Sequence, residues 1–196
     1  MIRLAELIDK PWHIQTAEMN YLFESPLRIG SWDVDNLATT ANNLAFTRQI
    51  MDKCPNPATY KSLNIYEYTV GNINYAIFVK NDFTQAFFSY HVDKDNNFVE
   101  DKVWQEFTSL GLCRDILFDY YLNRFNGIIS DATHSELGER YWKKIVDISI
   151  KNGYKAYAIF DNSNRPPTEL TTVDDMDKYY GFGSVALNTR FLIKKI

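Results

Sequence analysis

The residues best suited to chemistry form one short turn, Thr108-Ser109-Leu110-Gly111-Leu112-Cys113-Arg114. The turn leads into a predicted helix, whose first backbone N–H groups have no partner within the helix and point outward. The helix dipole adds partial positive charge there, Gly111 lets a ligand approach the main chain, and Arg114 adds a full charge. The turn therefore predicts a phosphate-binding site. The alternative is that Gly111 only turns the chain from a strand into a helix.

A second polar group, Ser130-Asp131 with His134, could act as a proton relay, because histidine titrates near neutral pH. The alternative is that Asp131, Thr133 and Ser135 are ordinary turn and cap residues. The sequence has no GxSxG, HExxH or Walker A motif, and its two cysteines form no CxxC pair. These patterns argue against a hydrolase, a zinc protease or an NTPase, and we expect no metal site.

The periodicity of apolar residues, which predicts the elements that position these side chains, changes near Gly111. Upstream of it, apolar residues alternate with polar ones between turn signals, which predicts an antiparallel meander. Its strands are Leu63–Val70, Ile73–Val79, Gln85–Val92 and Val103–Phe107. Before the meander we expect a helix over Leu37–Lys53, ended by the prolines at 55 and 57, and a shorter helix over Arg3–Asp9.

Downstream of Gly111, helical and strand periodicities alternate. The predicted order is a helix, a strand, a longer helix and two further strands: Arg114–Phe125, Gly127–Ser130, Ser135–Asn152, Lys155–Phe160 and Arg190–Ile196. In the longer helix, Leu137, Tyr141, Ile145 and Ile148 should share the buried face. The polar stretch Asn162–Asp177 is expected to be a loop. Together these patterns predict an α+β fold with a mixed sheet, an antiparallel meander followed by β-α-β-α-β, and helices on both faces.

Length and composition predict a single ordered domain over residues 1–196. Within it we expect a helical part (1–60), antiparallel strands (61–107) and a half that would hold a cofactor (108–196). The net charge of −4 argues against nucleic acid as the main partner. No apolar run is long enough for a membrane span, and the two separated cysteines suit a reducing compartment. We therefore expect a soluble cytoplasmic protein.

From about Leu63 to Ile196, the order of elements and the glycine turn resemble the GNAT-type N-acetyltransferases. In that family the turn has the pattern Arg/Gln-x-x-Gly-x-Gly/Ala, and its amides hold the pyrophosphate of acetyl-coenzyme A. Gly111 matches this pattern, whereas Thr108 and Cys113 depart from it. The resemblance implies acetyl-coenzyme A as cofactor, bound by Ser109, Leu110, Gly111, Leu112, Cys113 and Arg114. Ile128–Asp131, Gly138–Ile145 and Gly153-Tyr154 also look like a subgroup of small phage-encoded GNAT-like proteins.

The resemblance also implies two catalytic residues. The family's general base is a glutamate on the fourth strand, and Glu106 is the matching acid on the strand predicted to enter the turn; the alternative is an exposed strand carboxylate. The family's proton donor is a tyrosine on the last long helix, a place taken here by Trp142. Since an indole N–H has no useful acidity, either the neighbouring Tyr141 turns into the cleft and donates the proton, or the acid is absent.

Two functions follow from the resemblance. One is an acyl-coenzyme A-dependent N-acyltransferase that acts on an amine. The other is a catalytically degenerate binding protein, either a virion component or an anti-defence protein that binds a host factor. The residues alone also leave open a nucleotide- or nucleic-acid-binding protein. The net negative charge of the chain argues against this function.

Overall fold

The computed structural model describes residues 40–54, 56–105, 111–132, 136–160, 165–180 and 189–196. These residues form two compact units. Unit 1 comprises the described residues up to Ser89 and Lys102–Cys113, and unit 2 comprises Tyr90–Asp101 and the residues from Arg114 onward. Two strands, β4 (Phe83–Val92) and β5 (Phe98–Gln105), contribute residues to both units. The single domain expected from the sequence stays a prediction.

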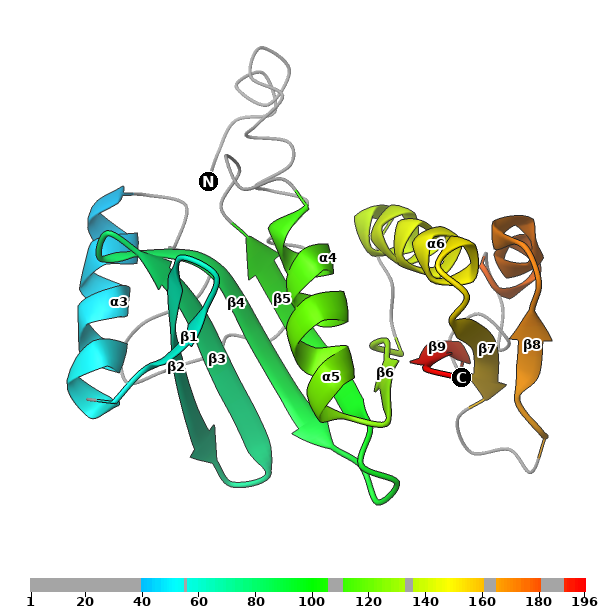
Figure 1. Cartoon of the computed structure of the whole chain (residues 1–196), viewed down its shortest axis with the longest axis horizontal. Helices are drawn as coiled ribbons and strands as arrows, with labels where there is room; N and C mark the ends of the chain where they lie inside the picture. Colours follow the sequence, from blue (N-terminus) through cyan, green and yellow to red (C-terminus); the bar gives the residue numbers. More distant parts are fainter. Residues whose placement is uncertain (1–39, 55, 106–110, 133–135, 161–164, 181–188) are drawn as a thin grey trace, which may run out of the picture. The chain divides into compact units, whose positions relative to one another are not determined.

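Unit 1 is an antiparallel meander packed against one helix (Figure 1). The helix α3 (Thr40–Lys53) is followed by β1 (Ala58–Tyr60), β2 (Leu63–Val70), β3 (Ile73–Lys80) and the first part of β4. The β2–β3 turn contains Gly71 at φ 64°, a conformation that glycine adopts without strain. Ile50 of α3 joins a core formed by alternate residues of the strands, Tyr66, Tyr75, Ile77, Val79, Phe87 and Trp104.

Unit 2 is a mixed sheet with the hydrogen-bonded order β4-β5-β6-β9-β7-β8. Its strands after β5 are β6 (Gly127–Ile129), β7 (Lys155–Phe160), β8 (Thr168–Leu170) and β9 (Thr189–Lys194). The strands β5 and β6 are parallel, whereas β6–β9, β7–β9 and β7–β8 are antiparallel. A parallel pair needs a crossover connection, and here it is the helical segment α4 (Leu112–Ile116), η3 (Leu117–Tyr121, a π-helix) and α5 (Leu122–Arg124).

Aromatic residues attach this helical segment to the strands of unit 2. Tyr121 packs on Phe98 of β5 with ring centroids 4.3 Å apart, and Tyr90 of β4 stacks on Phe98 at 4.5 Å. The predicted α+β fold, a mixed sheet with helices, is confirmed.

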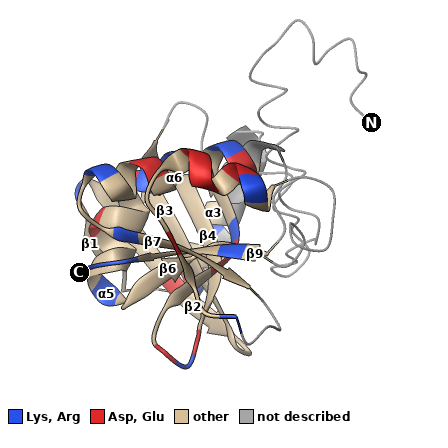
Figure 2. Cartoon of the chain, turned by 90° about the vertical axis from the view of Figure 1, so that its right-hand side faces the viewer, with Lys and Arg blue, Asp and Glu red and all other residues tan. Residues whose placement is uncertain are grey.

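The helix α6 (Glu136–Lys151) runs beside β7 in unit 2 (Figure 1). Its buried face contains Trp142, Ile145, Val146 and Ser149. Both basic and acidic residues lie along α6 (Figure 2). The predicted face, centred on Tyr141 and Ile148, is therefore displaced by about one residue, because Trp142 has the larger apolar surface to bury.

Three expectations about the remaining elements were wrong. The strand β5 begins at Phe98 and not at Val103, and β1 was not predicted. The stretch expected to be a loop contains β8 and most of a 3₁₀-helix, η4 (Val173–Tyr179), whose Met176 and Tyr179 are buried. The expected helix Arg3–Asp9 lies outside the described residues. Among the helices that the structure describes, none has the length and apolar character to cross a membrane.

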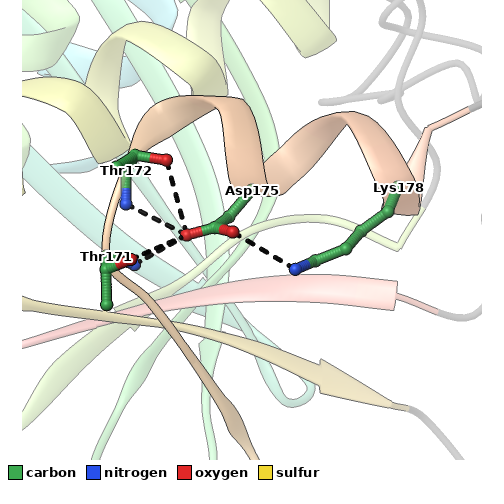
Figure 3. A network of polar contacts seen from close by, with 4 residues as sticks. All are labelled: Thr171, Thr172, Asp175 and Lys178. Atoms are coloured by element: carbon green, nitrogen blue, oxygen red, sulfur yellow. Dashed lines mark hydrogen bonds and ion pairs between the residues drawn. The ribbon is translucent and has the colours of Figure 1, made fainter.

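Asp175 organises the start of η4 (Figure 3). Its Oδ2 accepts hydrogen bonds from the amides of Thr172 (3.1 Å) and Thr171 (3.0 Å), and Lys178 Nζ lies 3.2 Å from Oδ1. The amide of Thr172, then that of Thr171, holds the pKa of Asp175 well below its usual range. This carboxylate therefore stabilises the folded chain above the ordinary aspartate pKa, and the contribution is lost as the pH falls through the lowered value.

We expect Asp175→Ala to open the start of η4. Without the carboxylate, the amides of Thr171 and Thr172 lose their acceptor, and their hydrogen exchange should accelerate roughly tenfold. Asp175→Asn is the control, because its side-chain carbonyl can still accept from a backbone amide. Equal exchange in the two variants would show that the side chain does not cap the helix.

Candidate active site

A buried carboxyl group, that of Glu100, lies in unit 2 at the point where two parallel strands stop pairing. The strands β5 and β6 pair at Phe98–Ile128 and Val99–Ile129, and Glu100 is the next residue of β5. Beyond Ile129 the chain follows β9 instead, because the Ser130 amide donates to the carbonyl of Phe191 at 2.9 Å. Glu100 thus follows directly after the end of the parallel ladder.

The two oxygens of Glu100 have different surroundings. Oε1 accepts a hydrogen bond from Nε1 of Trp142 on α6 at 3.3 Å. Oε2 is buried and has no hydrogen-bond partner among the described residues. Glu100 is 4% exposed and Trp142 is 1% exposed. A buried polar atom without a partner is costly and therefore marks a candidate functional site.

Burial raises the pKa of Glu100 to about 8. The hydrogen bond from Trp142 opposes this shift, while the nearby negative charges of Asp131 and Asp101 add to it. At neutral pH the carboxyl group is therefore mostly protonated, and it ionises as the pH rises through about 8. A group with such a pKa can both accept and return a proton near physiological pH.

The glycine turn is described only from Gly111 onward; Ser109 and Leu110 lie outside the described residues. Gly111 has φ 82°, which suits glycine. The Cys113 amide donates to Oε1 of Gln105 at 3.2 Å, and the buried Cys113 thiol donates to the carbonyl of Trp104 at 3.4 Å. The amide of Cys113 is therefore already occupied.

The other residues of the turn differ in their hydrogen bonding. The amides of Gly111 and Leu112 have no acceptor among the described residues. The guanidinium of Arg114 donates to Oδ1 of Asp115 from Nη2 (2.6 Å) and Nε (2.9 Å). A phosphate would therefore compete with Asp115 for this charge. Phosphate binding by the turn stays a prediction.

The catalytic roles of Glu106 and Tyr141 both stay predictions. Glu106 lies outside the described residues, and Tyr141 is half-buried with its ring edge-on to Trp142 at 6.1 Å. The strand that precedes the turn also contains Glu100, which the prediction missed because it started that strand at Val103. The available signal was Phe98-Val99, an apolar pair directly after the polar turn at 94–97.

The Ser130 hydroxyl has a structural role in unit 2. It accepts from the Phe191 amide at 2.9 Å and donates to the carbonyl of Asp131 at 2.7 Å. Oδ1 of Asp131 accepts from the amide of Ala132 at 2.5 Å. These bonds favour the turn interpretation over a proton relay, and His134 lies outside the described residues.

Sequence reasoning also missed a pair formed by His91 and Asp101, with Nδ1 and Oδ1 3.1 Å apart. Glu100 and Asp101 are consecutive strand residues, so this pair lies on the face of β5 opposite Glu100. In the part of the chain that the structure describes, no group of acidic, histidine or cysteine side chains could hold a metal ion.

The fold and this site define an α+β protein with a mixed sheet and a buried carboxyl group where its parallel strands part. No family model and no curated protein matches the chain. One similar solved structure, with a TM-score of 0.38 and 12% identity, is assigned to the GNAT family of acetyltransferases, from Bacteroides thetaiotaomicron; the match covers 80% of this chain and 82% of that one. An acetyltransferase from Streptococcus agalactiae matches with a TM-score of 0.36 and 14% identity over 95% and 93% of the two chains. Because both TM-scores lie below 0.5, neither likeness assigns this chain to a family.

Proposed function

We propose that this protein is an N-acyltransferase that takes its acyl group from acyl-coenzyme A and uses Glu100 for proton transfer. The observation that carries the proposal is the buried Glu100 carboxyl group at the end of the β5–β6 pairing. In sheets with parallel strands, ligands commonly bind beyond the carboxyl ends of those strands. Such an enzyme would work in the cytoplasm, the host's if the chain is encoded by a phage.

Acyl transfer from a thioester to an amine requires one proton to leave nitrogen and one to reach sulfur. The N–C bond forms, the C–S bond breaks, and no proton is gained or lost overall. A carboxyl group with a pKa of about 8 can accept the first proton and supply the second. Glu100 can therefore fill both roles expected of Glu106 and Tyr141.

Coenzyme A contains a pyrophosphate, between its pantetheine arm and its adenosine, that needs backbone donors and positive charge. The amides of Gly111 and Leu112 and the guanidinium of Arg114 fit this requirement, while Cys113 contributes no amide because Gln105 occupies it. When bound, acyl-coenzyme A supplies the activated acyl group. Nothing in the described residues selects one amine as acceptor.

A second candidate is a binding protein that retains the fold without catalysis, such as a virion component or a binder of a host factor. Two observations favour it: the bond from the Cys113 amide to Gln105, and the buried indole of Trp142 at the place where the resemblance expects an acidic phenol. Such a protein would bind neither acyl-coenzyme A nor an amine substrate.

Calorimetry with acetyl-coenzyme A separates the two candidates. We expect the parent protein to bind it and Gly111→Asp to bind at least about tenfold more weakly, because a carboxylate beside the pyrophosphate adds like-charge repulsion. Gly111→Asn is the matched control, since asparagine tolerates the positive φ of 82° about as well as aspartate does but has no charge.

An activity assay tests the chemistry. Release of free thiol with a panel of primary amines should rise with pH through about 8, as Glu100 ionises. Absence of binding by the parent would remove the enzyme and leave the binding protein.

A further inference from the structure

We propose that Trp142 is a positioning residue for Glu100: its indole holds Oε1, so that Oε2 is the oxygen that exchanges the proton. The catalytic meaning of this pairing rests on the proposed acyl transfer. The pairing itself rests on the 3.3 Å hydrogen bond from Nε1 of Trp142 and on the buried Oε2, which has no partner among the described residues. An indole at this place is thus no obstacle to proton transfer.

The two oxygens of a free carboxyl group are equivalent, and rotation about the last side-chain bond exchanges them. The Trp142 ring removes this equivalence, because it is 1% exposed and lies in the buried face of α6 with Ile145 and Val146. The buried indole N–H needs an acceptor inside the protein however the carboxyl group of Glu100 is rotated, so one carboxyl oxygen always faces it. The bond therefore selects one arrangement of the carboxyl group.

The chemistry of the donor determines which oxygen carries the proton. An indole nitrogen can only donate, and the carbonyl oxygen of a neutral carboxyl group accepts better than its hydroxyl oxygen, so the oxygen that faces the indole is the carbonyl oxygen. The proton of neutral Glu100 therefore sits on Oε2. A tyrosine hydroxyl, which both donates and accepts, would not impose this choice.

The proton then has a balanced path in the proposed reaction. Ionised Oε2 takes a proton from the attacking nitrogen as the N–C bond forms, and the same atom returns it to sulfur as the C–S bond breaks. Among the described residues, the charged groups that act on Glu100 are Asp131, which follows β6, and Asp101 on β5, and both favour the neutral acid. From α6 the contact is the uncharged indole, which favours the carboxylate.

The test is the titration of Glu100, followed by carbon NMR with labelled glutamate side chains. In the parent protein we expect a midpoint near pH 8. Trp142→Phe removes the hydrogen bond that stabilises the carboxylate, so the midpoint should move upward by about one pH unit, a tenfold change in the ionisation constant. Trp104→Phe is the matched control, because Trp104 is also buried, at 3% exposed, but has no hydrogen bond to Glu100. An unchanged midpoint in Trp142→Phe would overturn the proposal.

A second measurement needs no variant of Trp142. In the parent protein, the indole N–H resonance of Trp142 should move with the same midpoint as Glu100, because the bond strengthens when its acceptor becomes charged. Glu100→Gln should abolish that movement. An indole resonance that stays constant while Glu100 titrates would also overturn the pairing. If the pairing is found but the parent releases no thiol with any amine, the proposed function fails and the pairing remains.

Discussion

The free energy of unfolding of the parent protein should fall between pH 5 and pH 9, and Glu100→Gln should remove most of this fall. Folding raises the pKa of Glu100 from the ordinary value of 4.5 to about 8, chiefly through burial. Below about 4.5 both states hold the proton. Between the two values only the unfolded state releases it, so stability falls as the pH rises. Above about 8 the loss is complete and amounts to a few kcal/mol, on the order of 1.4 kcal/mol for each unit of pKa shift.

Urea unfolding at pH 5, 7 and 9 measures this effect. Glu100→Gln keeps an oxygen for the indole of Trp142 but cannot ionise, so its curve should be much flatter than that of the parent. Glu67→Gln, at a half-buried position of β2 in unit 1, is the control for replacing a strand glutamate. If the stabilities of parent and Glu100→Gln change in parallel over this pH range, the carboxyl group is not buried as the structure has it.

The parts of the fold that the sequence predicted well are those with a local signal. The helix end at Lys53 is encoded by the following prolines, and Lys155–Phe160 was predicted with its observed bounds. The helix η4 also has a local signal, the capping box of Thr172 and Asp175, but it lies within a polar stretch with two prolines that predicted a loop. Polar composition concealed a helix that buries only Met176 and Tyr179.

The site was harder to predict because its contacts join distant parts of the sequence. Glu100-Asp101-Lys102 interrupts the apolar alternation of β5, so the strand was predicted to begin too late. Trp142 lies 42 residues from Glu100, and no spacing rule connects them. The turn at Gly111 was visible as a pattern, whereas the occupation of the Cys113 amide by Gln105 depends on the side-chain conformation.

Replacing Gly127 by alanine should destabilise the protein by about 3 kcal/mol, at the upper end of what overpacking costs. A Cβ at this position would lie 2.8 Å from Oδ1 of Asn97, 2.8 Å from the carbonyl of Ile193 and 2.9 Å from Cδ1 of Leu192. The carbonyl belongs to the β6–β9 ladder and cannot move without breaking it. Asn97 is also fixed, because its side-chain amide donates to Oδ2 of Asp93 at 2.9 Å.

Gly71→Ala separates this crowding from the general cost of losing a glycine. Gly71 has φ 64°, and a Cβ added there would meet no atom within 4 Å, so its replacement should cost only about 1 kcal/mol of backbone strain. Adding Asn97→Ala to Gly127→Ala should restore part of the lost stability, because it relieves one close contact and leaves the carbonyl of Ile193 in place. Equal unfolding free energies for the Gly71 and Gly127 variants would contradict the close packing of β6.

The Gly127 variant also tests how the candidate site is built. Gly127 precedes Ile128, which pairs with Phe98 two residues before Glu100. A shift of β6 that relieves the crowding would disturb this pairing, and with it the position at which the parallel ladder ends. We therefore expect the titration midpoint of Glu100 to change in Gly127→Ala and to stay near 8 in Gly71→Ala. This result would show that the close contacts at Gly127 help to exclude water from the carboxyl group of Glu100.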